Sequence, residues 1–354
     1  MRPALLVSYT GMLGGGERIL LDYAGGLARP AVLACPEGPL AAAAREQGLE
    51  LAPLRERPIE LRASARRRLA APLGIAGLAR EVAGLVRSRQ PALVVAWSMR
   101  ALLGCALTVR GAGRPPLLFQ HNDLLPGGLV GATVRRAARR ADRVVCLSRA
   151  IAHDLALPGA EVIHAGVDLE RFHPPGTPPA EATALTLGAI VGWKRPDLAL
   201  EVAARVPGLR LRLAGEPLDE AGHHLLDQLR RRVARPDLAG RVELLGRLED
   251  PLEALRGSAC LLHCADREPY GLALVEALAC GVPVVAPAAG GPPEIVDESC
   301  GALYPPGDAT AAGEAVQAVL AEPSLRAGAR ARAEREFDRE RSRARFNELV
   351  EDLT

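Results

Sequence analysis

The sequence predicts an α/β protein with two similar halves, each holding a parallel sheet covered by helices. Three observations indicate this fold class. Short apolar runs of strand length alternate with helical patterns along the chain. A length of 354 residues is too great for one ordinary domain, so two domains are expected. A proline-rich stretch at 172–179 then offers the clearest boundary.

The composition is that of a globular protein with ample core, at 49% hydrophobic and 24% charged residues. Aromatic residues make up only 3%, so Leu, Val and Ala must fill the interior. A formal net charge of +2 argues against nucleic acid as the main partner. The 7 scattered cysteines favour reduced thiols, and no apolar run reaches transmembrane length. We therefore expect a cytoplasmic protein.

The first half begins with a strand, a glycine-rich loop and a helix. The apolar run Ala4–Tyr9 predicts a buried strand, and the loop 11–18 leads into a helical pattern that starts at Ile19. Backbone N–H groups in such a loop can meet a phosphate, although a tight structural turn has the same sequence. The fingerprint G-x-G-x-x-G is not cleanly present, so the loop alone is a weak signal.

More strand-like runs follow in the first half, separated by helical patterns. They lie at Ala31–Ala34, Leu93–Ala96, Leu117–Phe119, Arg143–Leu147 and Glu161–His164. In open parallel sheets, ligands bind beyond the carboxyl ends of the strands. The polar run from Gln120 to Asp123 occupies such an end. His121 is therefore a candidate ligand contact, with a structural role as the alternative.

The second half repeats this order, which gives about six strands to each half by the same pattern. Its runs lie at Ala184–Ile190, Leu209–Ala214, Val242–Leu245, Cys260–His263, Val282–Ala286 and Ala302–Tyr304. Lys194 and Arg195 follow the first run, and Pro196 fits the first turn of the next helix. Cations at this position suit a diphosphate, and two exposed basic residues are the alternative.

Two carboxylates eight positions apart, Glu268 and Glu276, stand out in the last third of the chain. Pro269 and Gly271 favour a turn, so Glu268 is placed in a loop and a helix is expected to begin near Leu272. Both carboxylates would then stand near a helix N-terminus, where an anionic ligand is best held. After a valine-rich strand, the segment closes on a turn with a third carboxylate: Gly290, Gly291 and Glu294.

Two arginine-rich stretches occur in the first half, and both are open to two interpretations. They contain Arg62, Arg66, Arg67 and Arg68, then Arg135, Arg136, Arg139, Arg140 and Arg143. They are either solvated helix faces or regions attracted to an anionic membrane surface or an acidic acceptor. A metal site is not expected, because His263 and Cys264 end a buried strand and the neighbouring pair His223 and His224 has no partner at ligand spacing.

These motifs together resemble the family-4 retaining glycosyltransferases, which have the GT-B architecture of two Rossmann-like domains facing a cleft. The resemblance covers nearly the whole chain. It is strongest for Glu268-x7-Glu276, followed by Ala-Cys-Gly-Val-Pro-Val-Val and Gly-Gly-x-Pro-Glu. The other matching segments are 14–18, 144–148, 164–168 and 192–197. The implied domains are an acceptor domain at 1–174, a nucleotide-sugar donor domain at 175–335, and a helix at 336–354 that docks on the first domain.

The resemblance implies a role for each candidate residue. Glu276 would accept hydrogen bonds from the nucleotide ribose hydroxyls, and Glu268 would hold hydroxyls of the donor sugar. Lys194 would stabilise charge on the leaving diphosphate, and His121 would contact the donor sugar from the opposite domain. The remaining donor-site residues would be Arg195, Gly15, Gly16, Tyr270, Gly271, Leu272, Gly290, Gly291 and Glu294.

The implied activity is retaining transfer from a nucleotide-diphosphate sugar, such as a UDP-sugar, to a hydroxyl of a natural product, glycolipid or polysaccharide precursor. The resemblance implies that it needs neither cofactor nor metal, and that it needs no protein base, since the leaving phosphate oxygen takes the acceptor proton. Ala189 replaces the usual arginine before the phosphate segment, and Cys264-Ala265 replaces the usual Pro-Ser. The alternatives are a sugar-nucleotide epimerase, a pseudo-glycosyltransferase, or a non-catalytic nucleotide-sugar-binding subunit.

Overall fold

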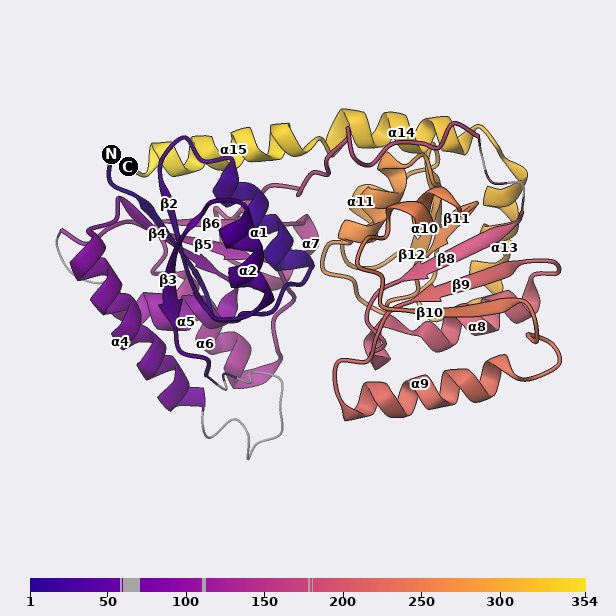
Figure 1. Cartoon of the computed structure of the whole chain (residues 1–354), viewed down its shortest axis with the longest axis horizontal. Coiled ribbons are helices and arrows are strands. Elements are labelled where there is room, and N and C mark those ends of the chain that lie inside the picture. The colour runs from indigo at the N-terminus through magenta and orange to yellow at the C-terminus, as the bar shows by residue number, and fades with distance from the viewer. Residues whose placement is uncertain (58, 60–70, 110–112, 178, 180) are drawn as a thin grey trace. The chain divides into compact units, whose positions relative to one another are not determined.

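The computed structural model describes residues 1–57, 59, 71–109, 113–177, 179 and 181–354 (Figure 1). They form two compact units, Met1–Ala165 with Glu340–Thr354, and Gly166–Arg339. Both units contain parallel sheets covered by helices, which confirms the predicted fold class. Within these ranges no helix is both long enough and apolar enough to cross a bilayer.

The division between the units falls before the proline-rich stretch, earlier than the predicted boundary between 174 and 175. The reason is a set of backbone contacts. The Val167 N–H donates to the Phe337 carbonyl at 2.8 Å, and Arg330 Nη1 donates to the Phe172 carbonyl at 2.8 Å. Phe172 is also buried. Residues 166–174 are therefore tied to the last part of the second unit.

The first unit is built on a seven-stranded sheet in the order β3-β2-β1-β4-β5-β6-β7. Its strands are β1 (Ala4–Ser8), β2 (Ala31–Pro36), β3 (Glu50–Leu54), β4 (Leu93–Trp97), β5 (Leu117–His121), β6 (Arg143–Cys146) and β7 (Glu161–Val162). Its helices are α1 (Gly15–Gly25), α2 (Pro39–Glu46), α4 (Ala71–Arg89), α5 (Met99–Thr108), α6 (Gly128–Ala138), α7 (Arg149–Leu155) and α15 (Arg339–Asp352). Strands β1 and β4 are buried throughout, which explains their continuous apolar sequences.

Strand β3 is the element that the sequence pattern does not predict. Its residues include Glu50 and Pro53, and proline lacks the N–H group that a strand normally donates. Among the described residues, this strand lies at the edge of the sheet and pairs with β2 alone. An edge strand needs hydrogen bonds on one side only, so proline is tolerated there and the apolar signal is weak.

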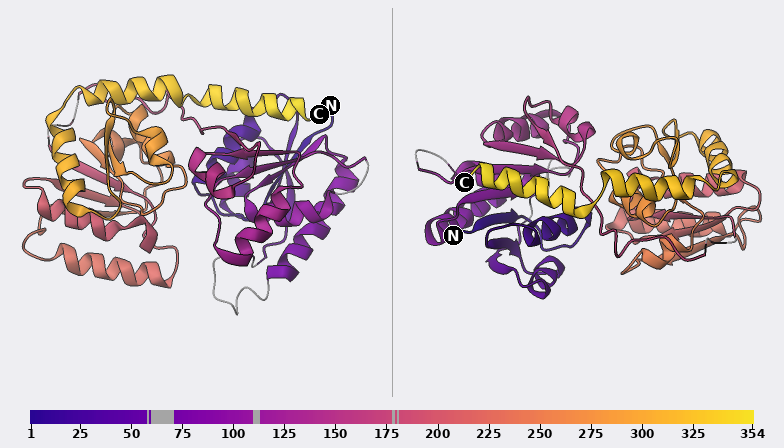
Figure 2. Two further views of the ribbon diagram at one scale, coloured as in Figure 1. Left: turned by 180° about the vertical axis from the view of Figure 1, so that it is seen from behind. Right: turned by 90° about the horizontal axis from the view of Figure 1, so that it is seen from above.

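The C-terminal helix α15 packs onto the first unit (Figure 2). Phe346 is fully buried, and its ring centroid lies 4.5 Å from that of Tyr23 and 6.3 Å from that of Trp97. An Arg29–Glu351 ion pair at 2.8 Å adds a charged contact at the end of the helix. In a chain with few aromatic residues, one buried phenylalanine contributes roughly 1.5–3 kcal/mol to this docking.

The second unit is built on a six-stranded sheet in the order β10-β9-β8-β11-β12-β13. Its strands are β8 (Thr183–Leu187), β9 (Arg210–Ala214), β10 (Val242–Gly246), β11 (Cys260–Leu262), β12 (Val284–Pro287) and β13 (Gly301–Tyr304). Its helices are η1 (Gly192–Lys194), α8 (Pro196–Arg205), α9 (Glu220–Val233), α10 (Leu252–Arg256), α11 (Leu272–Ala279), α12 (Pro292–Ile295), α13 (Ala309–Ala321) and α14 (Leu325–Glu336). Leu198, Val202 and Val316 join the buried core that α8 and α13 share with the sheet.

Each sheet reverses its strand order at one point, and these points locate the expected ligand sites. In the first sheet the reversal lies between β1 and β4, and in the second it lies between β8 and β11. Loops that leave the carboxyl ends of two such strands run to opposite sides and open a crevice. The segments that follow β8 and β11 contain Lys194 and Glu268.

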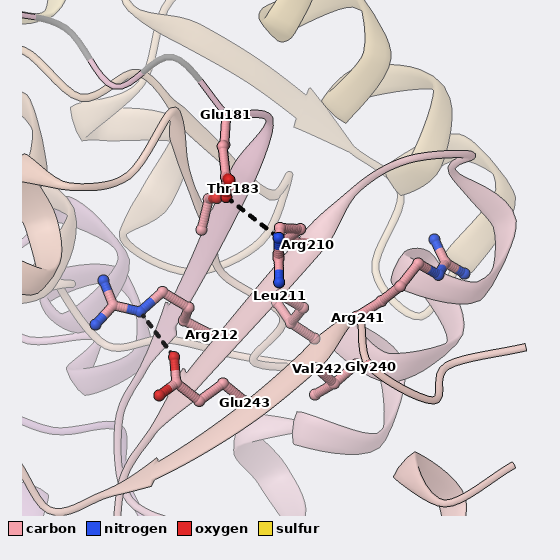
Figure 3. Close-up of a pocket in the computed structure, with 9 residues that line it drawn as sticks. All are labelled: Glu181, Thr183, Arg210, Leu211, Arg212, Gly240, Arg241, Val242 and Glu243. Atoms are coloured by element: carbon pink, nitrogen blue, oxygen red, sulfur yellow. Dashed lines mark ion pairs between the residues drawn. The ribbon is translucent and has the colours of Figure 1, made fainter.

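A pocket of about 540 Å³ lies at the other end of the second sheet, where β8, β9 and β10 begin (Figure 3). Its arginines face carboxylates: Arg210 Nη1 lies 3.6 Å from Glu181 Oε2, and Arg212 Nε lies 3.4 Å from Glu243 Oε2. The pocket therefore lies at the amino ends of the strands, away from the switch point, and we assign no role to it.

Candidate functional site

The loop after β8 brings Lys194 to the switch point of the second unit. The Gly188 N–H donates to the Ala214 carbonyl at 3.0 Å, which fixes the start of the loop. A single 3₁₀ turn, η1, then places Lys194 immediately before helix α8. The Lys194 ammonium contacts Glu268 Oε2 directly and lies 4.4 Å from the centre of the Trp193 ring. The predicted diphosphate cation and the predicted sugar contact are thus partners in this structure.

Glu268 is a buried carboxylate, with only 7% of its surface exposed. Its oxygen Oε2 faces Lys194 and also lies 3.1 Å from His263 Nε2. Burial alone would raise the pKa of the Glu268 carboxyl, but the Lys194 ammonium and the His263 ring outweigh it and hold this pKa at about 2. Glu268 is therefore ionised at neutral pH.

The predicted turn at Gly290 and Gly291 packs directly against the Glu268 loop. The Gly291 N–H donates to the Glu268 carbonyl at 2.7 Å, and Gly290 forms a parallel bridge with Glu268. A Cβ atom on Gly290 would lie 2.1 Å from the Glu268 carbonyl oxygen, and one on Gly291 would lie 2.4 Å from the Tyr270 carbonyl oxygen. Gly290 also has a φ of +73°, so glycine is needed for both conformation and space.

Helix α11 begins at Leu272, where the sequence predicts it, and follows Gly271 with a φ of +115°. Glu276 lies on this helix and is buried, with 8% of its surface exposed. Glu294 lies on the short helix α12, which follows the glycine turn. The structure therefore gathers Lys194 and Glu268 with the glycine turn, and it places Glu276 on the neighbouring helix.

Arg195 is directed differently from Lys194. Its Nε lies 3.1 Å from each carboxylate oxygen of Asp197, its Nη2 lies 2.9 Å from Asp197 Oδ2, and its Nη1 lies 3.3 Å from Asp266 Oδ1. Two carboxylates thus neutralise this guanidinium. Asp197 stands two residues after Arg195, so the sequence contained the signal for this pairing.

In the first unit, the predicted residues lie at the carboxyl edge of the sheet. Gly15 and Gly16 form the first turn of α1, and the Gly16 carbonyl accepts a hydrogen bond from Trp97 Nε1 at 2.9 Å. His121 ends strand β5, is fully buried and stacks on Phe119 with 5.0 Å between ring centroids. These contacts anchor the glycine loop and the histidine to the core of the unit.

The sequence reasoning missed polar residues at the switch point of the first unit. Arg100 Nη1 donates to the Tyr9 hydroxyl at 2.5 Å, and Arg100 Nε donates to the Ile59 carbonyl at 2.8 Å. Ser98 follows β4 with a φ of +95°, an unusual conformation for serine. Tyr9 follows β1 and Ser98 follows β4, so the strand-end rule could have found them once the strand order was known.

The structure describes only one of the two arginine-rich stretches, and its described residues also bear on whether side chains could bind a metal ion. Arg62, Arg66, Arg67 and Arg68 lie outside the described residues. In the second stretch, Arg135 donates to the carbonyls of Asp154 and Leu155, whereas Arg136, Arg139 and Arg140 are exposed. In the part of the chain that the structure describes, no three His, Cys, Asp or Glu side chains are grouped so that they could hold a metal ion.

Two consecutive Rossmann-like units of this kind define the GT-B class of folds. The family described as "Glycosyl transferases group 1" matches residues 169–336, and the one described as "Glycosyltransferase Family 4" matches residues 13–171. Together these matches span nearly the whole chain. The chain belongs to family 4 of the glycosyltransferases, which confirms the resemblance predicted from its motifs.

Relatives and solved structures agree with this assignment. The D-inositol 3-phosphate glycosyltransferase of Mycolicibacterium smegmatis is 31% identical over 246 residues, which are 64% of this chain and 54% of that protein. The protein of the same name from Mycobacterium tuberculosis is 36% identical over 152 residues, 38% of this chain and 30% of that protein. The chain thus spans about half, or less, of the curated relatives it matches.

Two solved structures share the fold over almost the whole chain. Anabaena HepE in complex with UDP superposes with a TM-score of 0.83 at 21% identity, and 99% of each chain is covered. Sucrose-phosphate synthase from Thermosynechococcus elongatus superposes with a TM-score of 0.83 at 19% identity, covering 100% of this chain and 99% of that one. At this level of identity, the likeness establishes the fold alone.

Proposed function

We propose that this protein is a retaining glycosyltransferase that moves a sugar from a nucleotide-diphosphate sugar to an acceptor hydroxyl. The observation that carries the proposal is the partly buried Lys194–Glu268 pair, held against the Gly290-Gly291 turn at the switch point of the second sheet. An ammonium suits a leaving diphosphate, and an ionised carboxylate suits sugar hydroxyls. The relatives named as glycosyltransferases support this reading of the pair.

The proposed reaction uses positioning and charge. The bond between the anomeric carbon and the leaving phosphate oxygen breaks while the acceptor oxygen bonds to the same face of that carbon. The leaving oxygen takes the acceptor proton, so no protein base is needed. Lys194 would neutralise the departing diphosphate, Glu268 would orient the sugar, and Glu276 would hold the ribose. His121, Gly15 and Gly16 remain predicted ligand contacts, and metal independence remains part of the proposal.

Ligand-induced stabilisation tests the donor site. The melting temperature would be measured with UDP, GDP, ADP and dTDP, each with and without Mg²⁺. A nucleotide present at 100 times its dissociation constant stabilises the fold by about 2.7 kcal/mol. We expect one nucleotide to raise the melting temperature without Mg²⁺. If none of the four does so under either condition, the donor-site assignment is wrong.

Product analysis tests the reaction. The matching nucleotide sugar would be incubated with simple polyols, phenols and D-inositol 3-phosphate, the last because the relatives carry that name. We expect release of the nucleoside diphosphate and an α-linked product from an α-linked donor, observed by NMR. A β-linked product would refute retention, and an altered nucleotide sugar without transfer would favour an epimerase.

A further inference from the structure

His263 is a buried histidine that the proposed reaction has not yet used. It follows strand β11 and has 5% of its surface exposed. Its N–H donates to the Val285 carbonyl at 2.8 Å, and its carbonyl accepts a hydrogen bond from the Tyr304 hydroxyl at 2.8 Å. Its backbone is therefore held by residues of β12 and β13. A ring on such a rigid support has a fixed direction, and this ring faces Glu268.

The contact with Glu268 determines which ring nitrogen carries the proton. Burial lowers the pKa of the His263 imidazole; Glu268 opposes this shift and Lys194 adds to it, so the ring is neutral at pH 7. The nitrogen Nε2 lies 3.1 Å from Glu268 Oε2. Two lone pairs at that distance would repel each other, which favours the tautomer with the hydrogen on Nε2, although in this structure that N–H does not point straight at Oε2. His263 thus places Nε2 beside the same carboxylate oxygen that Lys194 contacts, and a modest turn of the Glu268 carboxylate completes the hydrogen bond.

The Lys194 ammonium would interact with two anions, Glu268 and the leaving diphosphate. This competition explains why Glu268 needs a second neighbour such as His263. The ammonium neutralises Glu268 in this structure, yet the proposed function also directs it to the leaving diphosphate. When a diphosphate draws Lys194 away, a carboxylate that is 7% exposed loses its nearest cation. A buried carboxylate without a donor either takes up a proton or changes its position. His263 lies 3.1 Å from Glu268 Oε2 and does not depend on Lys194, so it is the neighbouring donor that Glu268 can turn to once Lys194 has left.

We propose that His263 is a positioning residue that holds Glu268 in place while Lys194 turns to the diphosphate of the donor. This inference rests on the proposed glycosyl transfer. It predicts that the histidine influences the chemical step and leaves nucleotide affinity nearly unchanged, because it touches Glu268 and not the nucleotide. It also predicts that a side chain with an amide N–H can replace it.

The first experiment compares His263→Leu, which removes the donor, with His263→Gln, which keeps an N–H group. UDP affinity would be followed through tryptophan fluorescence, since Trp193 is 43% exposed and adjoins Lys194. With UDP-glucose as the first donor tried, we expect kcat of the leucine variant to fall on the order of 10–100-fold. UDP affinity should stay within about twofold, and the glutamine variant should recover most of the activity.

The pH profile gives a readout that a merely structural role would not move. Glu268 must be ionised to orient the sugar, so activity falls as the pH drops through the pKa of Glu268. Without the His263 donor, this pKa rises, and the leucine variant should lose kcat at a higher pH than wild type does. His223→Leu serves as the control, because His223 is exposed on α9. Its profile should match that of wild type.

A measurement on the wild-type protein covers the case in which the leucine variant does not fold. Long-range ¹H–¹⁵N NMR reports the tautomer of each histidine, and the signal of His263 would be assigned with His263→Gln. We expect the neutral Nε2–H form. The Nδ1–H form, or wild-type kcat and pH profile in a folded leucine variant, would overturn the role of His263. Failure of wild type to transfer any sugar would instead refute the proposed function.

Discussion

The carboxyl edges of the two sheets differ in how they handle charge. In the second unit the edge holds a partly buried ion pair between Lys194 and Glu268, with a neutral histidine beside it. In the first unit the edge holds the fully buried side chains of Gln120 and His121 beside an Arg100–Tyr9 hydrogen bond. The difference teaches that the same fold can pair its cation with a carboxylate at one edge and with a phenol hydroxyl at the other.

The largest expected effect comes from removing the carboxylate of Glu268 at the carboxyl edge of the second sheet. Glu268→Ala leaves Lys194 without its partner and the donor sugar without its contact. We expect kcat to fall roughly 10²–10³-fold, with UDP affinity much less affected. Steady-state kinetics and a UDP titration separate these quantities, and Glu249→Ala, an exposed loop carboxylate, is the control. Unchanged kcat in a folded Glu268→Ala variant would mean that this carboxylate has no role in transfer. The charged edge of the second sheet would then have no functional difference from the edge of the first sheet.

The second test concerns the glycine turn that supports this edge. Gly290→Ala adds a Cβ 2.1 Å from the Glu268 carbonyl oxygen, at a φ of +73°. We expect a loss of about 2–4 kcal/mol of folding free energy, from backbone strain and overpacking together. Gly48→Ala is a matched control, because Gly48 has a φ of +74° but open space around its Cβ position.

Urea unfolding of the two glycine variants measures the difference. Gly48→Ala should show only the cost of strain, about 1–2 kcal/mol. Equal losses in the two variants would mean that the Glu268 loop moves away freely. The turn would then provide no rigid support for the buried carboxylate.

Glu276→Ala tests whether Glu276 on helix α11 accepts hydrogen bonds from the ribose hydroxyls of the nucleotide. We expect UDP affinity to fall about tenfold, since a hydrogen bond to a charged group contributes roughly 1.5–3 kcal/mol. A 2′-deoxy analogue of UDP sharpens the result. Wild type should bind it more weakly than UDP, whereas the alanine variant should bind both alike. Preference for UDP retained in full by the variant would exclude the ribose role.

The smallest expected effect distinguishes two neighbouring cations. Arg195→Met should change UDP affinity less than threefold, because Asp197 and Asp266 already neutralise the guanidinium. Lys194→Met should weaken it more, about tenfold, through loss of a charge-assisted contact to the diphosphate. Isothermal titration calorimetry with UDP measures both. A larger effect at Arg195 than at Lys194 would reverse their assigned roles.

Much of the fold could be predicted from local sequence. Fully buried parallel strands read as apolar runs, so β1 and β4 were found with bounds close to those of the structure. Strand β3 was not predicted, because an edge strand tolerates Glu50 and Pro53 and therefore shows no continuous apolar run. The glycines of the candidate site were also found, since positions such as Gly290 need a conformation that only glycine adopts easily.

The sequence by itself determined the two-unit α/β fold, the family, and the segments that carry the candidate site. Only the tertiary structure decided the pairings within it. Lys194 and Glu268 are 74 positions apart, and they meet because β8 and β11 are neighbours in the sheet. The direction of His263 likewise depends on hydrogen bonds to β12 and β13. Local pattern records burial and backbone conformation, whereas the partner of a charged group depends on which strands lie side by side.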